Sequence, residues 1–422
     1  MIELKEKQEL AIAISYMKKG NDREILQENL NELSFLIETA GATVIEKFWQ
    51  ELERPNRSTL IGKGKVEEIK DFISEENIDL AVFDDELTPM QIRNLEDGLG
   101  IKVMDRSGVI LDIFAERAKS NEAKTQVELA QLQYLLPRLT RMWTHLSKQH
   151  GGIGTKGPGE TQIETDRRLI RTRIEHLKRK LDSIEKQSVQ KRLSHKGMVR
   201  FGLVGYTNAG KSTLMKLLTQ SNVYIKDKLF ATLDTTVRKF QLPEGQDVLL
   251  SDTVGFIKKL PTHLVASFRS TLSEARESDY LLHVVDVSNE FFRDHINTVD
   301  KTLLSLGIEG DNIILIFNKI DLLEDMDELS IIKEEYPDSI YISASKGLQL
   351  EKLRELLQDK HNILSKEISL KLPYEKSNLL SDLYQFGEVL ERIEDDFGFE
   401  FKVRVKDETE GKFIAIFDEF VS

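Results

Sequence analysis

The spacing of apolar residues changes several times along the chain. In the first 115 residues, short β-rich runs at 11–16, 42–46, 79–83 and 102–105 alternate with segments whose apolar residues recur every three or four positions. Alternation of this kind is typical of strands that are joined by helices, with the strands pairing in parallel. We therefore expect a small α/β subdomain with a parallel sheet at the N-terminus.

A helical pattern follows, up to residue 197. Apolar residues keep a three-four spacing over 132–146 and again over 163–184. Two amphipathic helices with such seams predict an antiparallel helical hairpin. Pro137 is expected to kink the first helix without ending it, because the seam stays in phase. Thr161 and Glu164 form a capping-box pattern that is expected to begin the second helix.

The two predicted helices are joined by a segment that is rich in glycine. Residues 151–160 contain five glycines, and His150 and Lys156 accompany them. A flexible connection fits this composition. A tip at which the backbone approaches RNA closely fits it as well, because glycine adds no side chain to the contact.

The remainder of the chain divides into two further segments. Apolar runs after residue 366, at 368–372, 400–405 and 412–417, together with a helical pattern over 379–393, predict a small α+β domain at the C-terminus. The fold expected is α/β and multidomain. The expected domains are 1–115, 116–197, 198–365 and 366–422.

Composition limits the classes of protein that the chain can belong to. Its 422 residues suffice for roughly two to four domains, and no apolar run approaches the roughly 18 residues of a membrane span. The charged start of the chain lacks the apolar core of a signal peptide. There is no cysteine, so disulfides and thiolate metal sites are excluded. The eight histidines show no ligand spacing, which argues against a histidine metal site. We expect a cytoplasmic monomer, and peripheral association with a membrane stays open.

Charge is distributed unevenly. Residues 137–200 hold 16 Lys or Arg and 6 Asp or Glu, a net charge of +10, whereas the whole chain carries −13. The rest of the chain therefore carries −23. A basic segment on an acidic body suggests a surface for an anionic partner, although a solvated helical face is the more ordinary fate of charged residues.

Residues 205–212 read Gly-Tyr-Thr-Asn-Ala-Gly-Lys-Ser and match a phosphate-binding loop. A strand-like run precedes this loop and a helical pattern follows it, as the motif requires. Lys211 is expected to contact the β- and γ-phosphates, and the Ser212 hydroxyl to ligate Mg²⁺. The segment Gly62-Lys-Gly-Lys65 lacks this spacing, so we expect it to initiate a helix or to contact RNA.

Three further motifs follow in order, each at the end of an apolar run. Asp252-Thr-Val-Gly255 can hold Mg²⁺ and meet the γ-phosphate. Asn318-Lys-Ile-Asp321 places a carboxylate that accepts from both guanine N1–H and the exocyclic amine, a pair of donors that adenine lacks. Ser343-Ala-Ser345 would bring a backbone N–H to the guanine O6. Together they predict a site for GTP and GDP.

The segment around residues 230–237 lies where the first nucleotide-sensing switch is expected. Thr232 is our candidate for a second Mg²⁺-ligating hydroxyl, with Thr235 as the alternative. Phe256 stands where GTPases that activate their own water carry a glutamine, which predicts slow intrinsic hydrolysis. Asn208 occupies a loop position that could help to hold K⁺ near the phosphates.

The candidate catalytic residues are Lys211 and Thr232, and the candidate metal ligands are Ser212, Thr232 and Asp252. The candidate nucleotide-binding residues are Gly205, Tyr206, Thr207, Asn208, Ala209, Gly210, Lys211, Ser212, Thr213, Phe230, Ala231, Thr232, Leu233, Asp252, Thr253, Val254, Gly255, Asn318, Lys319, Ile320, Asp321, Ser343, Ala344 and Ser345.

The run that begins at Gly151 and continues to Arg168, followed by the phosphate loop, Phe230-Ala-Thr-Leu-Asp234 and Asp252-Thr-Val-Gly-Phe-Ile257, resembles the HflX-type GTPases. The resemblance covers about residues 1–365. It implies that the N-terminal α/β subdomain and the helical hairpin are followed by a Ras-like P-loop GTPase domain over 198–365. It implies binding of the 50S large ribosomal subunit near the peptidyl-transferase region, through the hairpin and its loop. It also implies GTP-controlled dissociation or rescue of 70S ribosomes under stress. Our own hypothesis is that hydrolysis serves release and not separation.

With the basic segment, this resemblance gives a set of candidate RNA contacts. They are Arg138, Arg141, His150, Gly151, Gly152, Gly154, Lys156, Gly157, Gly159, Arg167, Arg168, Arg171 and Arg173. Two other functions stay open. One is a regulatory GTPase that acts on a protein or membrane complex through the hairpin, and the other is a nucleotide-dependent remodeller of ribosomal RNA.

Overall fold

The computed structural model describes residues 8–20, 22–139, 158–192, 198–219, 229–230, 236–253, 255–259, 273–308, 310, 312–323, 326–395 and 397–421. These residues fall into two compact units, each with its own contacts. The first unit holds the described residues up to Asp182 together with Leu229, Phe230 and Lys259, and the second holds the others. Within the described ranges, no helix has the length and hydrophobicity that crossing a membrane requires.

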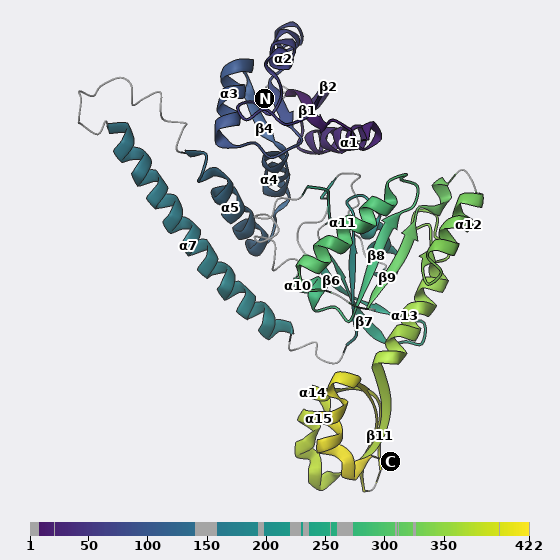
Figure 1. The fold of residues 1–422 in the computed structure, drawn as a ribbon. Coiled ribbons are helices and arrows are strands. Elements are labelled where there is room, and N and C mark those ends of the chain that lie inside the picture. Colours follow the sequence, from purple (N-terminus) through teal and green to yellow (C-terminus); the bar gives the residue numbers. More distant parts are fainter. Residues whose placement is uncertain are drawn as a thin grey trace, which may run out of the picture. The chain divides into compact units, whose positions relative to one another are not determined.

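The first unit begins with a four-stranded sheet. Its strands are β1 (Leu10–Lys18), β2 (Thr43–Leu52), β3 (Leu80–Phe83) and β4 (Lys102–Asp105). They lie in the order β2-β1-β3-β4 (Figure 1), and all three pairings are parallel. The parallel sheet expected from the sequence is confirmed, and the carboxyl ends of its strands meet at one edge.

Four helices connect and follow these strands. They are α1 (Arg23–Thr39), α2 (Lys63–Glu76), α3 (Pro89–Leu99) and α4 (Arg106–Arg117). Isoleucines of α2 and leucines of α3 share one apolar core with the sheet, while α1 and α4 contact each other and the strands. Gly62 is the N-cap of α2, so the glycine-lysine segment there initiates a helix, one of the two roles expected for it.

A helical hairpin follows, as predicted. Its helices are α5 (Asn121–Leu135) and α7 (Pro158–Arg192), and they pack through Leu129 of α5 against Ile174 and Leu177 of α7. Towards the start of α5, Lys180 Nζ donates to Asn121 Oδ1 at 2.9 Å. Further along α5, Glu128 pairs with Arg173, so residue numbers decrease along α7 as they increase along α5. The helices are therefore antiparallel.

Both predicted helix boundaries near the glycine-rich segment were wrong. The first helix, α5, ends at Leu135 and is not merely kinked by Pro137. Leu136 still has helical dihedrals as the C-cap, but Pro137 has no backbone N–H with which to continue the hydrogen bonding. The second, α7, begins at Pro158 and not at Thr161, and a proline in the first turn of a helix needs no hydrogen bond from its nitrogen. Residues 140–157 lie outside the described part of the chain.

The second unit is built on a six-stranded sheet. Its strands are β5 (Arg200–Gly205), β6 (Thr236–Gln241), β7 (Asp247–Asp252), β8 (Tyr280–Asp286), β9 (Ile313–Asn318) and β10 (Ile340–Tyr341). Their order is β10-β9-β8-β5-β7-β6. Only β6 runs antiparallel to its neighbour, while the other pairings are parallel. This arrangement agrees with the expected Ras-like domain.

Helices cover both faces of this sheet. On one face, α8 (Lys211–Thr219) and α13 (Leu350–Leu364) enclose the larger apolar core of the unit. On the other, α11 (Phe292–Ser305) and α12 (Met326–Glu335) pack over a second core. A short helix, α10 (Ser273–Arg276), precedes β8. The sheet is thus enclosed, which explains why its central strands are continuous apolar runs.

The end of the chain forms a small α+β domain, as predicted. Strands β11 (Ser365–Pro373), β12 (Gly387–Glu394) and β13 (Gly398–Lys406) form an antiparallel sheet in the order β11-β13-β12. Helices α14 (Leu380–Phe386) and α15 (Asp407–Phe417) pack on it.

Two elements of this domain differ from the sequence prediction. The helix expected over 379–393 ends at Phe386, and the chain continues as β12. At Gly387 a Cβ would lie only 2.3 Å from a methyl of Val403, so the strands approach there closely enough to need glycine. The run 412–417 is helical, because Phe413 and Phe417 are four residues apart and both are fully buried on one face.

Candidate nucleotide site

The phosphate loop connects β5 to α8 and depends on two glycines. Gly205 has φ of +145°, and a Cβ there would lie 2.2 Å from the Val284 carbonyl oxygen. Gly210 has φ of +96°, and its Cβ would lie 2.2 Å from the Asn318 Nδ2. Side chains at either position would therefore collide with neighbouring strands, which explains the glycine spacing of the motif.

Lys211 is buried and is held across the loop. Its ammonium donates to the carbonyl oxygens of Gly205 at 2.9 Å and Tyr206 at 2.7 Å. Burial lowers the pKa of Lys211 to about 8, while the nearby Asp252 carboxylate opposes that shift. A cation in such a poorly solvated position is strongly attracted to an anionic phosphate.

The structure brings together two of the three predicted metal ligands. Ser212 Oγ donates to Asp252 Oδ2 at 3.2 Å, and Asp252 is the last residue of β7. Hydroxyl and carboxylate oxygens are the ligands that Mg²⁺ prefers. Thr232 and its alternative Thr235 lie outside the described residues. In the described ranges no group of three or more His, Asp or Glu could hold a metal by itself, so these oxygens suit an ion shared with phosphates.

The segment after β7 pairs with the phosphate loop. Phe256 N donates to Gly205 O at 3.1 Å, and Thr207 N donates to Phe256 O at 2.7 Å. Thr253 Oγ1 donates to Leu203 O at 2.7 Å and fixes the turn beneath. Gly255 therefore lies beside the loop, where a Cβ on it would come within 3.1 Å of Thr207 Cα, and the contact of its N–H with a terminal phosphate stays a prediction. Val254 lies outside the described residues.

Phe256 cannot replace a catalytic glutamine. Its side chain is buried, and a phenyl ring offers no group that could orient water. Nearby, the Tyr206 ring stacks on His295 at 3.8 Å, and the Lys258 N–H donates to Tyr206 Oη at 2.8 Å. The stretch from Phe256 to Lys258 is thus tied to the loop by backbone and side-chain bonds.

Asn318, the last residue of β9, joins two loops of the site. Its Nδ2 donates to Ala209 O at 2.8 Å, and its Oδ1 accepts from Ala344 N at 2.9 Å. Lys319 has a left-handed backbone with φ of +66°, and its ammonium binds Asp286 at 2.6 Å. Ile320 begins the turn η2 (Ile320–Leu322).

Asp321 has the properties required of a base-recognising carboxylate. Hydrogen bonding by Ser343 is the main cause that lowers the pKa of Asp321, and Ser345 Oγ donates to its Oδ2 at 3.3 Å. Ser343 in turn accepts from Lys346 N at 3.2 Å, which holds the loop after β10 in place. The carboxylate therefore stays ionised, as its predicted contact with guanine requires.

Phe230 has an unexpected environment. Its ring meets the ring of Phe114 edge-on at 4.7 Å within the first unit, and it is only 2% exposed. Ala231 and Leu233 lie outside the described residues, whereas Thr213 lies within α8. The assignment of Phe230 to the nucleotide site stays a prediction.

Arg138 has several internal partners. Its guanidinium binds Asp105 at 2.8 Å, donates to the carbonyl oxygens of Leu87 and Tyr134, and lies over the Tyr134 ring. Asp105 also accepts from Gly108 N at the start of α4. These contacts give Arg138 a structural role in the first unit, and its contact with RNA stays a prediction.

The other candidate RNA contacts differ in exposure. Arg168 and Arg171 are exposed on α7, Arg167 is half-buried, and Arg173 is bound by Glu128 through two hydrogen bonds. Gly159 lies in the first turn of α7. The remaining candidates, which are Arg141, His150, Gly151, Gly152, Gly154, Lys156 and Gly157, lie outside the described residues.

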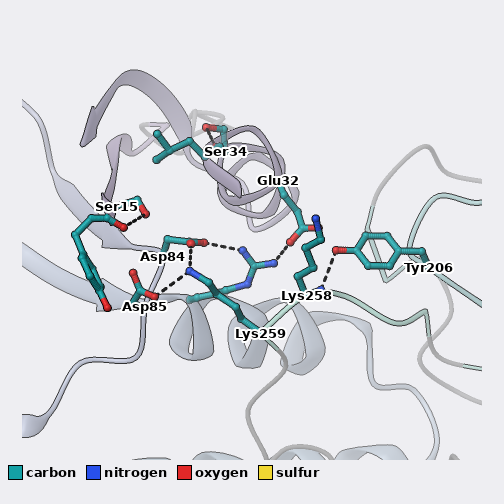
Figure 2. Close-up of polar contacts among 11 residues, drawn as sticks. Ser15, Glu32, Ser34, Asp84, Asp85, Tyr206, Lys258 and Lys259 are labelled. Atoms are coloured by element: carbon teal, nitrogen blue, oxygen red, sulfur yellow. Dashed lines mark hydrogen bonds and ion pairs between the residues drawn. The ribbon is translucent and has the colours of Figure 1, made fainter. Parts of the chain in front are cut away.

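Sequence reasoning missed a charged cluster at the carboxyl edge of the N-terminal sheet. Figure 2 shows Lys259 reaching Asp84 and Asp85, the two residues that follow β3. Arg106 binds Asp84 at 2.8 Å and also binds Glu32 of α1. Two adjacent aspartates at the end of a buried strand were the available signal.

Comparison with known families covers most of the chain. Residues 27–115 match the family described as "GTP-binding GTPase N-terminal", and residues 117–195 match "GTP-binding GTPase Middle Region". Residues 200–319 match "50S ribosome-binding GTPase".

Individual relatives agree. The chain is 45% identical to "GTPase HflX" of Caldanaerobacter subterraneus subsp. tengcongensis, over 96% of this chain and 93% of the relative. It is 54% identical to "GTPase HflX" of Flavobacterium psychrophilum, over 74% of this chain and 76% of the relative. Among solved structures, "crystal structure of SsGBP and GDP complex" is 27% identical over 84% of this chain and 98% of that chain, with a TM-score of 0.48.

Proposed function

Because the chain belongs to the HflX family of GTPases, we propose that its GTP-bound state binds the large ribosomal subunit and separates the subunits of idle or stalled 70S ribosomes. The chain is a GTPase. The arrangement of its four motifs at one edge of the six-stranded sheet carries the nucleotide part of the proposal.

The residues of this edge divide the work of binding and hydrolysis. Lys211 and the N–H groups of the phosphate loop would hold the β- and γ-phosphates, and Asp321 would select guanine. Ser212, Asp252 and Thr232 would hold Mg²⁺, which supplies positive charge against the oxygens of the transferring phosphate. We also propose that Asn208, whose backbone is left-handed with φ of +60°, helps to hold K⁺ beside the phosphates.

Hydrolysis by the isolated chain should be slow. The buried Phe256 leaves the usual position of the water-orienting side chain without a polar group. A partner that orders this segment or supplies the missing group would accelerate the reaction. We propose that the large ribosomal subunit is that partner.

Two observations favour ribosomal RNA as the binding surface. The segment 137–200 carries a net charge of +10 in an otherwise acidic chain, and Arg168 and Arg171 of α7 are exposed to solvent. In addition, Ile174 and Leu177 are buried against α5. The apolar seam of the hairpin is therefore occupied within the chain, which weakens the alternative of a protein-binding coiled coil.

The proposed mechanism is a shift in population. GTP would order Thr232 and the segment from Asp252 to Phe256, favouring the state that binds the large subunit and opposes subunit joining. Hydrolysis would then release the factor and would not drive the separation. We also propose that the chain acts as a monomer in the cytoplasm.

GTP turnover tests this proposal when it is measured alone and with 50S subunits, 30S subunits or 70S ribosomes. We expect strong stimulation by 50S and 70S particles and none by 30S. Separation of 70S ribosomes should also proceed with a non-hydrolysable GTP analogue. Absence of stimulation by any particle would leave a GTPase whose partner is a protein.

A further inference from the structure

Tyr206 is the second residue of the phosphate loop, at a position where the motif itself requires no particular side chain. Its side chain is nevertheless buried, with 5% of its surface exposed. The Tyr206 ring lies parallel to the His295 ring, with 3.8 Å between the centroids and 9° between the planes. His295 belongs to the first turn of α11 and is also buried. The stack therefore fixes the Tyr206 ring, and with it the place of the hydroxyl.

That hydroxyl binds the segment that follows the Asp-x-x-Gly motif. Lys258 N donates to Tyr206 Oη at 2.8 Å (Figure 2). Two residues earlier, Phe256 exchanges backbone hydrogen bonds with Gly205 and Thr207, the two neighbours of Tyr206 in the loop. The segment from Phe256 to Lys258 is thus held at both ends by the phosphate loop, through backbone at one end and through a side chain at the other.

The side chain of Lys258 reaches the start of α11 as well. Its ammonium lies 3.8 Å from Asp294 and 5.5 Å from the centre of the Phe291 ring. An ion pair of this length with a half-exposed carboxylate contributes little. The buried hydroxyl of Tyr206 is therefore a firmer attachment for Lys258 than these contacts are.

Gly255 lies one residue before this segment and close to Lys211. A Cβ on Gly255 would come within 3.2 Å of Lys211 Nζ. The same ammonium donates to Tyr206 O at 2.7 Å. A shift of the segment would therefore move Gly255 relative to the cation that is expected to hold the phosphates.

We propose that Tyr206 is a positioning residue for GTP hydrolysis: its hydroxyl holds the segment from Gly255 to Lys258, and the stack on His295 holds its ring. All of these residues lie within the second unit. A segment that is ordered before the reaction loses less entropy when Gly255 must meet the terminal phosphate. This assignment rests on the GTPase activity and does not depend on which partner the chain binds.

Two measurements without ribosomes test this role. One is amide hydrogen exchange of residues 255–258 in the nucleotide-free chain, and the other is single-turnover GTP hydrolysis. Tyr206→Phe removes the hydroxyl and keeps the ring. We expect exchange of the segment to become about three- to tenfold faster and hydrolysis to become slower by a similar factor, because one hydrogen bond is lost. GDP affinity should stay within about twofold of the unaltered chain, since GDP lacks the phosphate that Gly255 is expected to meet.

Two variants of His295 test the stack. His295→Phe keeps an aromatic ring and should retain most of the rate. His295→Ala removes the ring and should slow hydrolysis about as much as Tyr206→Phe, because an aromatic pair contributes about as much as one hydrogen bond. The double variant Tyr206→Phe/His295→Ala should be little slower than either single variant, since both changes loosen the same attachment.

Tyr280→Phe is the matched control. Tyr280 also stacks on an aromatic ring, that of Phe201, with 6.0 Å between the centroids. It is the first residue of β8, so it lies at the amino end of a parallel strand and not at the edge that carries the nucleotide motifs. Loss of its hydroxyl should leave both the hydrolysis rate and the exchange of residues 255–258 within about twofold of the unaltered chain.

Two results would overturn the proposal. One is a Tyr206→Phe rate that rises or stays within about twofold of the unaltered chain, and the other is an equal loss in Tyr280→Phe. Neither result would affect the proposed ribosomal function, which is read from stimulation by 50S particles. Conversely, a lack of such stimulation would leave this proposal standing.

Discussion

The side-chain amide of Asn318 donates to the backbone carbonyl of Ala209 at 2.8 Å, across 109 residues of sequence. The same amide accepts from Ala344 N at 2.9 Å. One buried side chain therefore links the phosphate loop to the loop after β10, and the two parts of the nucleotide site are held in register by it.

Replacement of Asn318 should damage both stability and nucleotide affinity. Asn318→Ala removes two buried hydrogen bonds and leaves their backbone partners unsatisfied, so we expect the free energy of unfolding to fall by about 2–3 kcal/mol. GDP affinity should fall about tenfold or more, since the phosphate loop loses its support. Urea unfolding with and without GDP measures both. Asn312→Ala, at an exposed asparagine before the same strand, is the matched control and should change neither quantity.

Base selection should depend on Asp321. Asp321→Asn replaces two accepting oxygens by one oxygen and one donor, so the guanine N1–H and amine lose a partner. We expect GDP affinity to fall by about 10²–10⁴, and xanthosine diphosphate, which presents an acceptor in place of the amine, to bind better than GDP. Competition binding of the two nucleotides gives the ratio. Unchanged preference for GDP would contradict this role, and Asp338→Asn on the exposed turn before β10 serves as control.

The buried Asp84 should give stability a distinctive pH dependence. Burial raises the pKa of Asp84 to about 6, against the attraction of Lys259, and the facing groups are Arg106, Asp85 and, through Arg106, Glu32. This value lies above the ordinary one of 3.8, so the folded state binds the proton more tightly than the unfolded state. Asp84 therefore adds stability as the pH falls from about 6 toward 4.

Melting temperatures of the unaltered chain and of Asp84→Asn, recorded across this pH range, check the sign. The difference between the two should move in favour of the unaltered chain as the pH falls, because the asparagine cannot take up the proton. A difference that stays constant with pH would contradict the prediction.

The nucleotide site could be predicted from the sequence because its residues lie in short contiguous motifs. Gly205, Gly210 and Lys211 act through backbone conformation and through a charge beside a loop, and each motif stands at the end of an apolar strand. Parallel strands bring such ends together whatever the rest of the fold does.

Contacts between residues far apart in the sequence could not be predicted in this way. Nothing near Lys259 in the sequence indicates Asp84, which lies 175 residues earlier, and nothing near Arg138 indicates Asp105. The run 412–417 was taken for a strand, because six residues are too few to distinguish the period of a helix from that of a strand. Only packing of Phe413 and Phe417 on β13 decides it.

Monovalent cations should affect turnover if Asn208 helps to hold K⁺. The Asn208 side chain is exposed at a left-handed turn of the loop, so it is free to reach an ion beside the phosphates. Replacing K⁺ by Na⁺ at constant ionic strength should lower GTP turnover, and Asn208→Ala should abolish the difference. Equal rates in both salts would remove this part of the proposal.

Binding of the large subunit should depend on salt through α7. Each phosphate contact releases counterions, and about 6–10 contacts on DNA weaken binding by about 10³–10⁵ between 50 and 200 mM salt; the direction should be the same for RNA. Changing Arg167, Arg168 and Arg171 together to Gln should weaken 50S binding and flatten this dependence. The matched control changes Lys178, Arg179 and Lys186 of the same helix to Gln, which removes equal charge outside the predicted contacts. If both triple variants lose the same affinity, binding responds to total charge and not to the predicted arginines. A flat salt dependence in the unaltered chain would reject an electrostatic hairpin surface.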